Sequence, residues 1–355
     1  MAKERIFDVP ETKGEFKVRG NIKGTAKDSF FESKTTKAGK HMNVLKFGVE
    51  VNKDSTVYLD LNPTERDDVY FYKRPAVKGE KGTTKKIPWL KRADFNEEGF
   101  SLIGMKIGIN KIIDDKGKEK NETKTYAEFD GAEVLSKQLK DNMGVFIKGS
   151  IKYSSFINDK EEVKRKVSFE PNQVSGVSKD IDFEAEDFKS TNDFQQTIIF
   201  MEAVMDESNP DDKKGIISAK IVTYNSIEDT EFIVRDGKLF KMFKKNLKPY
   251  TAIKVHGEIF NKVDSEEETE DDGWGEKSTF DAVNKSFIRE LVIKGADPAT
   301  IDTETYNQKA IDKAYVAINS TKQAKEEFGN EKADESWGEV KGDSSNSDDD
   351  DNGWD

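Results

Sequence analysis

The stretch from Tyr70 to Arg92 combines two kinds of side chain that can hold an unpaired polynucleotide, namely cations and flat rings. It carries eight basic residues and one acid, a local charge of +7 in a chain whose net charge is −12. Lysine and arginine neutralise phosphates and release counterions, and aromatic rings stack on unpaired bases of any sequence. The stretch therefore predicts contact with a single strand. A solvated loop without a ligand, or a nuclear import signal, would have a similar composition.

The residues expected to make this contact lie in the stretch itself and in the segments before it. The cations expected along the backbone are Arg19, Lys23, Lys40, Lys73, Arg74, Lys85, Lys86, Lys91 and Arg92. The rings expected to stack on bases are Tyr58, Tyr70, Tyr72 and Trp89.

Residues that would carry out catalysis are not apparent in the sequence. The chain has no cysteine and two histidines, which argues against a thiolate or histidine-built metal site. It contains no glycine loop of the Walker or dinucleotide type, and acidic pairs mean little among 70 acids. We therefore expect a protein that is not an enzyme and uses neither metal nor cofactor.

The N-terminus is charged from its third residue, which argues against a secretory signal, and no apolar run approaches the ~18 residues of a membrane helix. We expect a soluble, cytoplasmic protein with no membrane partner.

The length of the chain leaves room for two domains of roughly 100 to 200 residues. Charge is uneven, since residues 1–179 carry a net +8 and residues 180–355 a net −20. A basic half joined to an acidic half is typical of a nucleic-acid binder with an interaction tail.

Apolar residues alternate with polar ones along several segments of the basic half. This period of two predicts strands at 16–22, 45–51, 57–61, 103–109, 145–151 and 163–169, and helical spacing predicts a helix at 131–142. We expect one domain at 1–179, with residues 70–92 as a long basic and aromatic loop.

The acidic half repeats this order after an acidic linker at 180–193. Strands are predicted at 196–204, 216–224, 230–234, 253–259 and 286–293, with a helix at 239–247. Gly149 and Gly257 occupy the same relative place in the two copies. We expect a second domain at 194–325, with an acidic insertion at 264–276.

A helix is expected to close the second domain at 305–328. Thr305 and Gln308 form a capping box, and Ile311, Ala314 and Ile318 share an apolar face with Tyr315 that should pack on the second domain. The remainder, 329–355, is too acidic to fold alone. The predicted fold is mainly β with minor α: two OB-like five-stranded barrels in tandem, a C-terminal helix and a disordered acidic tail.

The run V-x-I-x-G-x-I at Val145 to Ile151, after a helix and before a hairpin, resembles the second half of bacterial and phage single-stranded DNA-binding proteins. The segments VRGNIKG, from Val18, and MNVLKFGVEVN, from Met42, are similar to the first half of that family. The resemblance implies an OB fold that coats and protects single-stranded DNA during replication, recombination or repair, and a bacteriophage origin. The loop at 70–92 is long for the family, and the second copy lacks a comparable basic loop.

The C-terminal tail carries the other feature of this family. Acids surround a tryptophan at Glu270 to Glu276, at Asp334 to Glu339 and at the end of the chain. The resemblance implies that the last cluster docks on replication and recombination proteins, the ring supplying burial and the acids meeting a basic rim. The residues expected to do so are Asp348, Asp349, Asp350, Asp351 and Trp354.

Two other classes of function remain open at the level of sequence. An RNA-binding module could use the same barrel, because no residue is recognisably placed to read a 2′-hydroxyl. A non-catalytic interaction scaffold would use the acidic half as its working part. The oligomeric state is not indicated.

Overall fold

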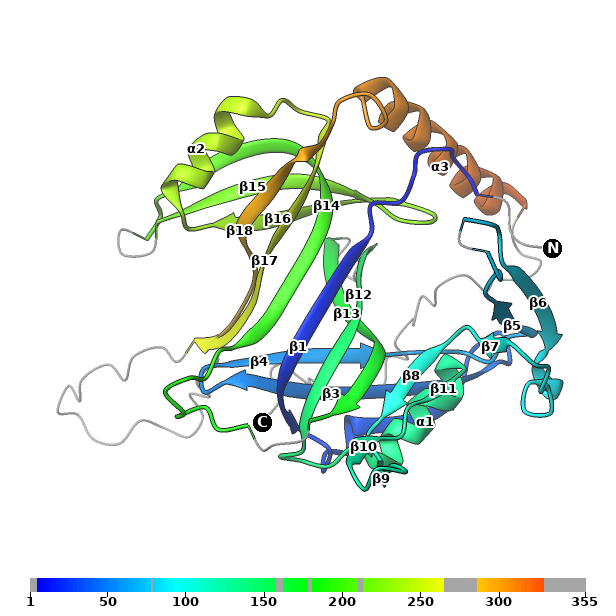
Figure 1. Ribbon diagram of the computed structural model, residues 1–355. Coiled ribbons are helices and arrows are strands. Elements are labelled where there is room, and N and C mark those ends of the chain that lie inside the picture. The colour runs from blue at the N-terminus through cyan, green and yellow to red at the C-terminus, as the bar shows by residue number, and fades with distance from the viewer. Residues whose placement is uncertain are drawn as a thin grey trace, which may run out of the picture.

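The computed structural model describes residues 5–77, 79–157, 162–177, 181–209, 213–264 and 286–328. Strands dominate this part of the chain, together with three α-helices, which confirms a mainly β protein (Figure 1). Residues 265–276 of the acidic insertion and the whole of the predicted tail lie outside the described residues. No helix within the described ranges combines the length and apolar character that crossing a bilayer requires.

The first half of the fold is built around β1 (Gly14–Lys23). This strand pairs antiparallel with β3 (His41–Asn52) and β12 (Gly144–Ile157). β3 also pairs with β2 (Phe31–Thr35) and β4 (Ser55–Leu61), and β12 forms a hairpin with β13 (Val163–Gly176). Beyond β13, β8 (Met105–Gly108) runs parallel to it and β11 (Lys124–Tyr126) antiparallel to β8. Helix α1 (Glu128–Gln138) buries Ala132 and Leu135 in the core of this half.

The second half contains five strands and one helix. β14 (Thr191–Asp206) pairs with β15 (Lys214–Val222) and with β17 (Thr251–Asp264). β16 (Ile227–Val234) pairs with β15 and runs parallel to β18 (Ser286–Asp302), which forms a hairpin with β17. Helix α2 (Gly237–Asn246) connects β16 to β17. Each of these five strands therefore has two partners among the other four.

The two glycines aligned in the sequence have the same structural role. A Cβ on Gly149 would lie 2.0 Å from the carbonyl oxygen of Glu170, and a Cβ on Gly257 would lie 1.9 Å from that of Val292. In both halves a register shift occurs at this glycine, where one strand passes unusually close to its hairpin partner. The internal repeat inferred from the sequence thus extends to strand geometry.

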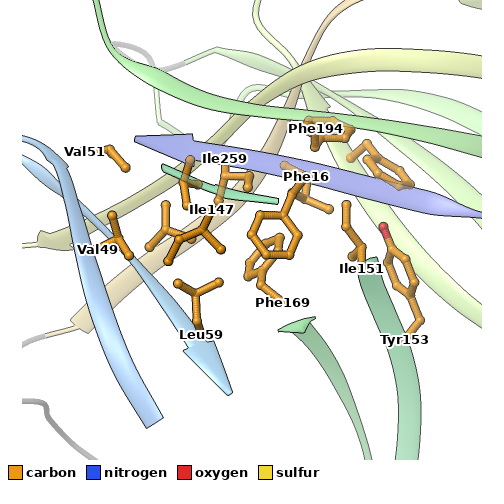
Figure 2. Close-up of a cluster of buried hydrophobic side chains, with 14 of the residues drawn as sticks. Phe16, Val49, Val51, Leu59, Ile147, Ile151, Tyr153, Phe169, Phe194 and Ile259 are labelled. Atoms are coloured by element: carbon orange, nitrogen blue, oxygen red, sulfur yellow. The ribbon is translucent and has the colours of Figure 1, made fainter. Parts of the chain in front are cut away.

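The two halves are joined through their first strands. β1 pairs antiparallel with β14, from Gly14 opposite Gln196 to Arg19 opposite Thr191, so that one thirteen-stranded sheet runs through both halves. One hydrophobic core also runs through them. Figure 2 shows Phe16 and Phe169 of the first half close to Phe194 and Ile259 of the second. The halves were expected to be two barrels in tandem, and a shared sheet and core were not foreseen.

Residues 70–92 differ from the expected long loop, because 70–73 and 83–88 belong to two strands of a second sheet. β5 (Asp68–Lys73) pairs antiparallel with β6 (Thr83–Pro88) and with β7 (Phe100–Leu102). A separate hairpin of β9 (Lys111–Ile113) and β10 (Glu119–Asn121) turns at Asp114, whose carboxylate accepts the backbone N–H groups of residues 116 and 118.

Helix α3 (Gln308–Phe328) begins three residues later than the capping box predicts. The carboxamide of Asn307 accepts the N–H of Ala310 at 3.0 Å and so caps the helix, whereas the N–H of Thr305 donates to Asp302 in the preceding turn. Ile311, Ala314 and Ile318 pack, as expected, on second-half residues, and Phe7 and Val9 of the N-terminal arm join the same cluster. Those second-half residues are Ile199, Val222, Ile227 and Ala252.

Candidate nucleic-acid interface

The small sheet β6-β5-β7 has one buried face and one open face. Along β5, Val69 and Phe71 are buried, whereas Tyr70 and Tyr72 are 42% and 37% exposed. This alternation follows from the pleat, which points successive side chains to opposite faces. The buried face packs into a cluster that includes Trp89, Phe100, Leu102 and Phe129. The two tyrosines therefore lie on a sheet whose opposite face is fixed by packing.

The open face carries a small group of polar and aromatic side chains, which we call the tyrosine face: Tyr70, Tyr72, Thr84 and Lys86. Tyr70 lies opposite Lys86, and Tyr72 lies opposite Thr84. Lys86 Nζ is 2.7 Å from a carboxylate oxygen of Asp68, and the hydrogen bond to that carboxylate raises the pKa of Lys86. A Cβ on Gly82 would lie 2.3 Å from the Tyr72 hydroxyl, so a glycine there leaves room for this ring.

Trp89 was expected to stack on a base, and the structure corrects that prediction. Its side chain is only 8% exposed and meets the Phe129 ring edge to face, with 5.9 Å between centroids. The guanidinium of Arg92 covers the Trp89 ring at 3.7 Å from the centroid. Trp89 is therefore a core residue that fixes the small sheet to α1.

Arg92 was expected on the phosphate backbone, and it too has a structural role. Its Nε and Nη2 donate to the two carboxylate oxygens of Asp130 on α1, each at 2.8 Å, and Nη1 donates to the Trp89 carbonyl. The hydrogen bond to Asp130 raises the pKa of Arg92. Because this pair is bidentate and partly buried, it orients α1 against the small sheet.

The remaining cations of the stretch divide between the faces of the small sheet. Lys73 and Lys85 lie opposite the tyrosines in the pleat, and both approach the Phe100 ring, at 5.6 and 4.8 Å from its centroid. Lys85 also pairs with Glu97, and Lys73 donates to the carbonyl of Glu98. Arg74 and Lys91 are exposed.

The predicted site residues outside the stretch lie on other elements. Arg19 is half-buried on β1, and Lys23 pairs with Glu50 at 3.3 Å. Lys40 pairs with Asp67, one residue before β5, at 3.7 Å. Tyr58, on β4, lines a small hollow between the two halves. The thirteen predicted residues are thus spread over several surfaces and do not line one common groove.

A second basic surface was missed at the level of sequence. On β1, Arg19 lies opposite Phe146 of β12, and Lys17 lies opposite Lys148. The ammonium of Lys148 lies 5.5 Å from the Phe146 ring centroid. Further along β12 and β13 the sheet carries more cations and an exposed ring. We call the whole set the basic strand face: Lys17, Arg19, Phe146, Lys148, Lys152, Phe156, Lys164 and Lys166.

Among these cations, Lys166 pairs with Asp60 at 2.9 Å and Lys164 pairs with Glu162. The signal that could have revealed this face is the pair Lys148 and Lys152, four residues apart on β12, followed by Lys164 and Lys166 on the returning strand. The tail residues Asp348 to Asp351 and Trp354 lie outside the described residues. Within those residues, no cluster of three or more acids or histidines could hold a metal ion.

A family model described as YorF matches residues 75–331, which is more than half of the chain. The chain therefore belongs to the YorF family.

Two solved structures resemble the fold. One is the wild-type single-stranded DNA binding protein from Thermus aquaticus, with a TM-score of 0.38 and 10% identity over 81% of this chain and 93% of that one. The other is a deletion mutant of the same protein, with a TM-score of 0.38 and 9% identity over 81% and 94% of the two chains. No curated protein sequence matches the chain.

Proposed function

We propose that this chain is a non-catalytic protein that binds single-stranded DNA without reading its sequence, and that it coats and protects the strand. The observation that carries this proposal is the tyrosine face, where two half-exposed rings stand side by side on a rigid small sheet. Base stacking on such rings contributes about 1 to 3 kcal/mol per base and tolerates any base.

The spacing of the two rings supports an extended strand as the ligand. Residues two apart on a strand are separated by about 6.6 Å, roughly twice the 3.4 Å rise between bases of a duplex strand. A strand pulled out of its stacked form can place successive bases on Tyr70 and Tyr72, whereas a duplex keeps its bases paired inside. Lys86, opposite Tyr70, is placed to meet a phosphate, and its exposed ion pair with Asp68 costs little to exchange.

The basic strand face supplies a route for the phosphate backbone in this proposal. Its cations project from neighbouring strands, and Phe146 and Phe156 offer further rings. Because cation contacts with phosphates release counterions, affinity should fall steeply as salt rises.

The strand order of each half supports OB-like barrels as the scaffold. In both halves the first strand pairs antiparallel with the strand that follows the helix, and the last strand runs parallel to a strand that precedes the helix, β8 in the first half and β16 in the second. We propose the two domains at 1–179 and 194–325 on this basis. The sequence resemblance supports a role in bacteriophage DNA replication, recombination or repair in the host cytoplasm, with the tail recruiting partner proteins.

Replacing both Tyr70 and Tyr72 with alanine should weaken binding of labelled oligo-dT by more than tenfold, because two stacking contacts are lost. The measurement is fluorescence anisotropy at two salt concentrations, with oligo-U and duplex DNA as further ligands. Tyr224→Ala is the matched control, since Tyr224 is also 42% exposed but belongs to the second half.

Unchanged affinity in the double variant would exclude the tyrosine face as the binding surface. Tighter binding of oligo-U than of oligo-dT would indicate an RNA-binding protein. No affinity for any of the three ligands would favour an interaction scaffold.

A further inference from the structure

Helix α2 is a basic element in the acidic half of the chain. Residues 237–248 contain five lysines and no acid, while residues 180–355 carry a net charge of −20. Phe240 and Phe243 point into the core, and the lysines of this segment are exposed. Lys241, Lys244 and Lys245 lie three and four residues apart, so they share one side of the helix.

This lysine row borders an apolar hollow. Lys244 lines a shallow pocket together with Val204 and Met205 near the end of β14. Val204 is 46% exposed and Met205 is 39% exposed. Phe200, Ala203 and Leu247 complete its apolar lining, and Glu202 adds one acid. We call this pocket and the lysines Lys241, Lys244 and Lys245 the α2 pocket.

The α2 pocket combines an apolar floor with a cationic rim, which suits a ligand that carries a large ring next to several negative charges. The ring would displace water from Val204 and Met205, which favours binding because apolar surface is removed from water. The acids would meet the lysines, a complementarity that mainly selects the partner and speeds encounter.

The end of this same chain has that composition. Four consecutive aspartates, Asp348 to Asp351, precede Trp354, and the intervening residues are Asn352 and Gly353. The distance is also suitable. A protein of 355 residues has a radius of gyration of about 20 Å, and the 27 residues beyond α3 can extend to roughly 90 Å.

We propose that the α2 pocket is a docking site for residues 348–355 of this chain, with Trp354 in the apolar hollow and the aspartates on the lysine row. This interaction does not depend on whether the chain binds DNA. The tail would then be bound within its own chain, and partner proteins would have to displace it from the α2 pocket.

A nucleic acid is the less suitable occupant of the α2 pocket. Phosphates would find the lysines, but the described side chains that line the hollow include Val204, Met205 and Glu202 and no exposed ring on which a base could stack.

The test uses the full chain in which Asp348 to Asp351 are changed to asparagine and Trp354 to alanine, called the tail-neutral chain. A fluorescent peptide with the sequence of residues 343–355 should bind this chain saturably, as measured by fluorescence anisotropy at low salt. It should bind the unmodified chain at least tenfold more weakly, because the attached tail competes at high effective concentration. Equal affinity for the two chains, or no binding, would overturn the proposal.

The site is tested by adding Lys241→Glu, Lys244→Glu and Lys245→Glu to the tail-neutral chain, which should reduce peptide affinity at least tenfold. The matched control changes Lys116, Lys118 and Lys120, on the exposed β9–β10 hairpin, to glutamate and should leave peptide affinity within about twofold of the tail-neutral chain. An equal loss in the control would show attraction to overall charge and overturn the assignment. A peptide with alanine at Trp354 should also bind at least tenfold more weakly.

An oligo-dT titration of the same variants separates this inference from the proposed function. The lysine changes on α2 should leave oligo-dT affinity within about twofold. If they abolish oligo-dT binding and spare the peptide, the α2 pocket is a nucleic-acid surface and the tail assignment is wrong. If no variant binds oligo-dT but the peptide results hold, the docking site stands and the proposed DNA binding fails.

Discussion

Glu170, on β13, lies in surroundings that disfavour the ionised form of its carboxyl group. Burial raises the pKa of its carboxyl group from an ordinary 4.5 to about 7, and the nearby carboxylates Asp60 and Glu128 add to this effect. Lys152 and Lys166 act in the opposite direction. The folded protein therefore holds this proton more tightly than the unfolded chain does.

The sign of the resulting pH dependence follows from the raised pKa. Between about pH 4.5 and pH 7 the folded state keeps the proton and the unfolded state releases it, so the free energy of unfolding falls as pH rises and is flat with respect to this group above pH 7. At about 1.4 kcal/mol per pKa unit, the total effect is at most about 3.5 kcal/mol.

Glu170→Gln should remove that dependence, because the amide is neutral at every pH. We expect the variant to be more stable than the wild type at pH 8 and similar to it at pH 4.5, as measured by urea denaturation at both values. A variant that is destabilised equally at both pH values would show that Glu170 contributes through a contact and not through its charge.

Composition alone could not decide which aromatic residue of the stretch is exposed. Tyr70, Phe71 and Tyr72 are consecutive, and their division between two faces follows from β5 being a strand, which the residue types alone do not indicate. Trp89 is buried because Phe129 and Arg92 cover it. Asp130, the partner of Arg92, lies 38 residues away and belongs to another element, so local composition could not show that this cation is already paired.

At the scale of elements, the small sheet depends on its attachment to α1. Arg92 and Asp130 form a partly buried bidentate pair. Glu128, on the same turn of α1 as Asp130, pairs with Arg66 at 2.7 Å, and both of these side chains are exposed. Partly buried pairs are costly to break because the remaining charge loses its partner, while exposed pairs contribute about 0 to 1 kcal/mol.

Arg92→Met should therefore loosen the small sheet without unfolding the rest of the chain. We expect the amide protons of β5 and β6 to exchange at least tenfold faster, with the amides of β14 and β17 unchanged, in native-state hydrogen exchange. Arg66→Met, the matched control, should change exchange in β5 and β6 less than threefold. Equal effects of the two changes would argue against Arg92 as the fastening residue.

Most other elements were predictable, because their side chains follow a single period. The strands around Phe16, Leu59, Ile147 and Ile217 alternate between a buried and a more exposed face, and that alternation is visible in the residue types. The small sheet was not predictable in this way, since the tyrosines on its open face are nearly as apolar as the residues behind them.

At the scale of the whole molecule, the shared sheet decides whether the halves can exist apart. β1 is bonded to β12 on one side and to β14 on the other over the same residues, and Phe16 packs into a core that continues to Phe194. A separated first half would expose a strand edge and apolar surface together, which favours aggregation.

Residues 1–179 and 194–325, produced separately, should each be insoluble or self-associated, and they should form a folded complex when produced together. Size-exclusion chromatography and circular dichroism of the three preparations measure this. A monomeric, folded fragment 1–179 would instead support two domains that fold independently, as the sequence order indicated.

The N-terminal arm has a consequence for the order of events during synthesis. Phe7 and Val9 pack among residues of β14, β15 and α3, and the backbone N–H of Thr12 donates to the carbonyl of Val222. The arm leaves the ribosome first, but the surface on which it packs is complete only after Ile318 has been translated. We therefore expect this segment to stay accessible to proteases on nascent chains until α3 emerges, and to become protected in one late step.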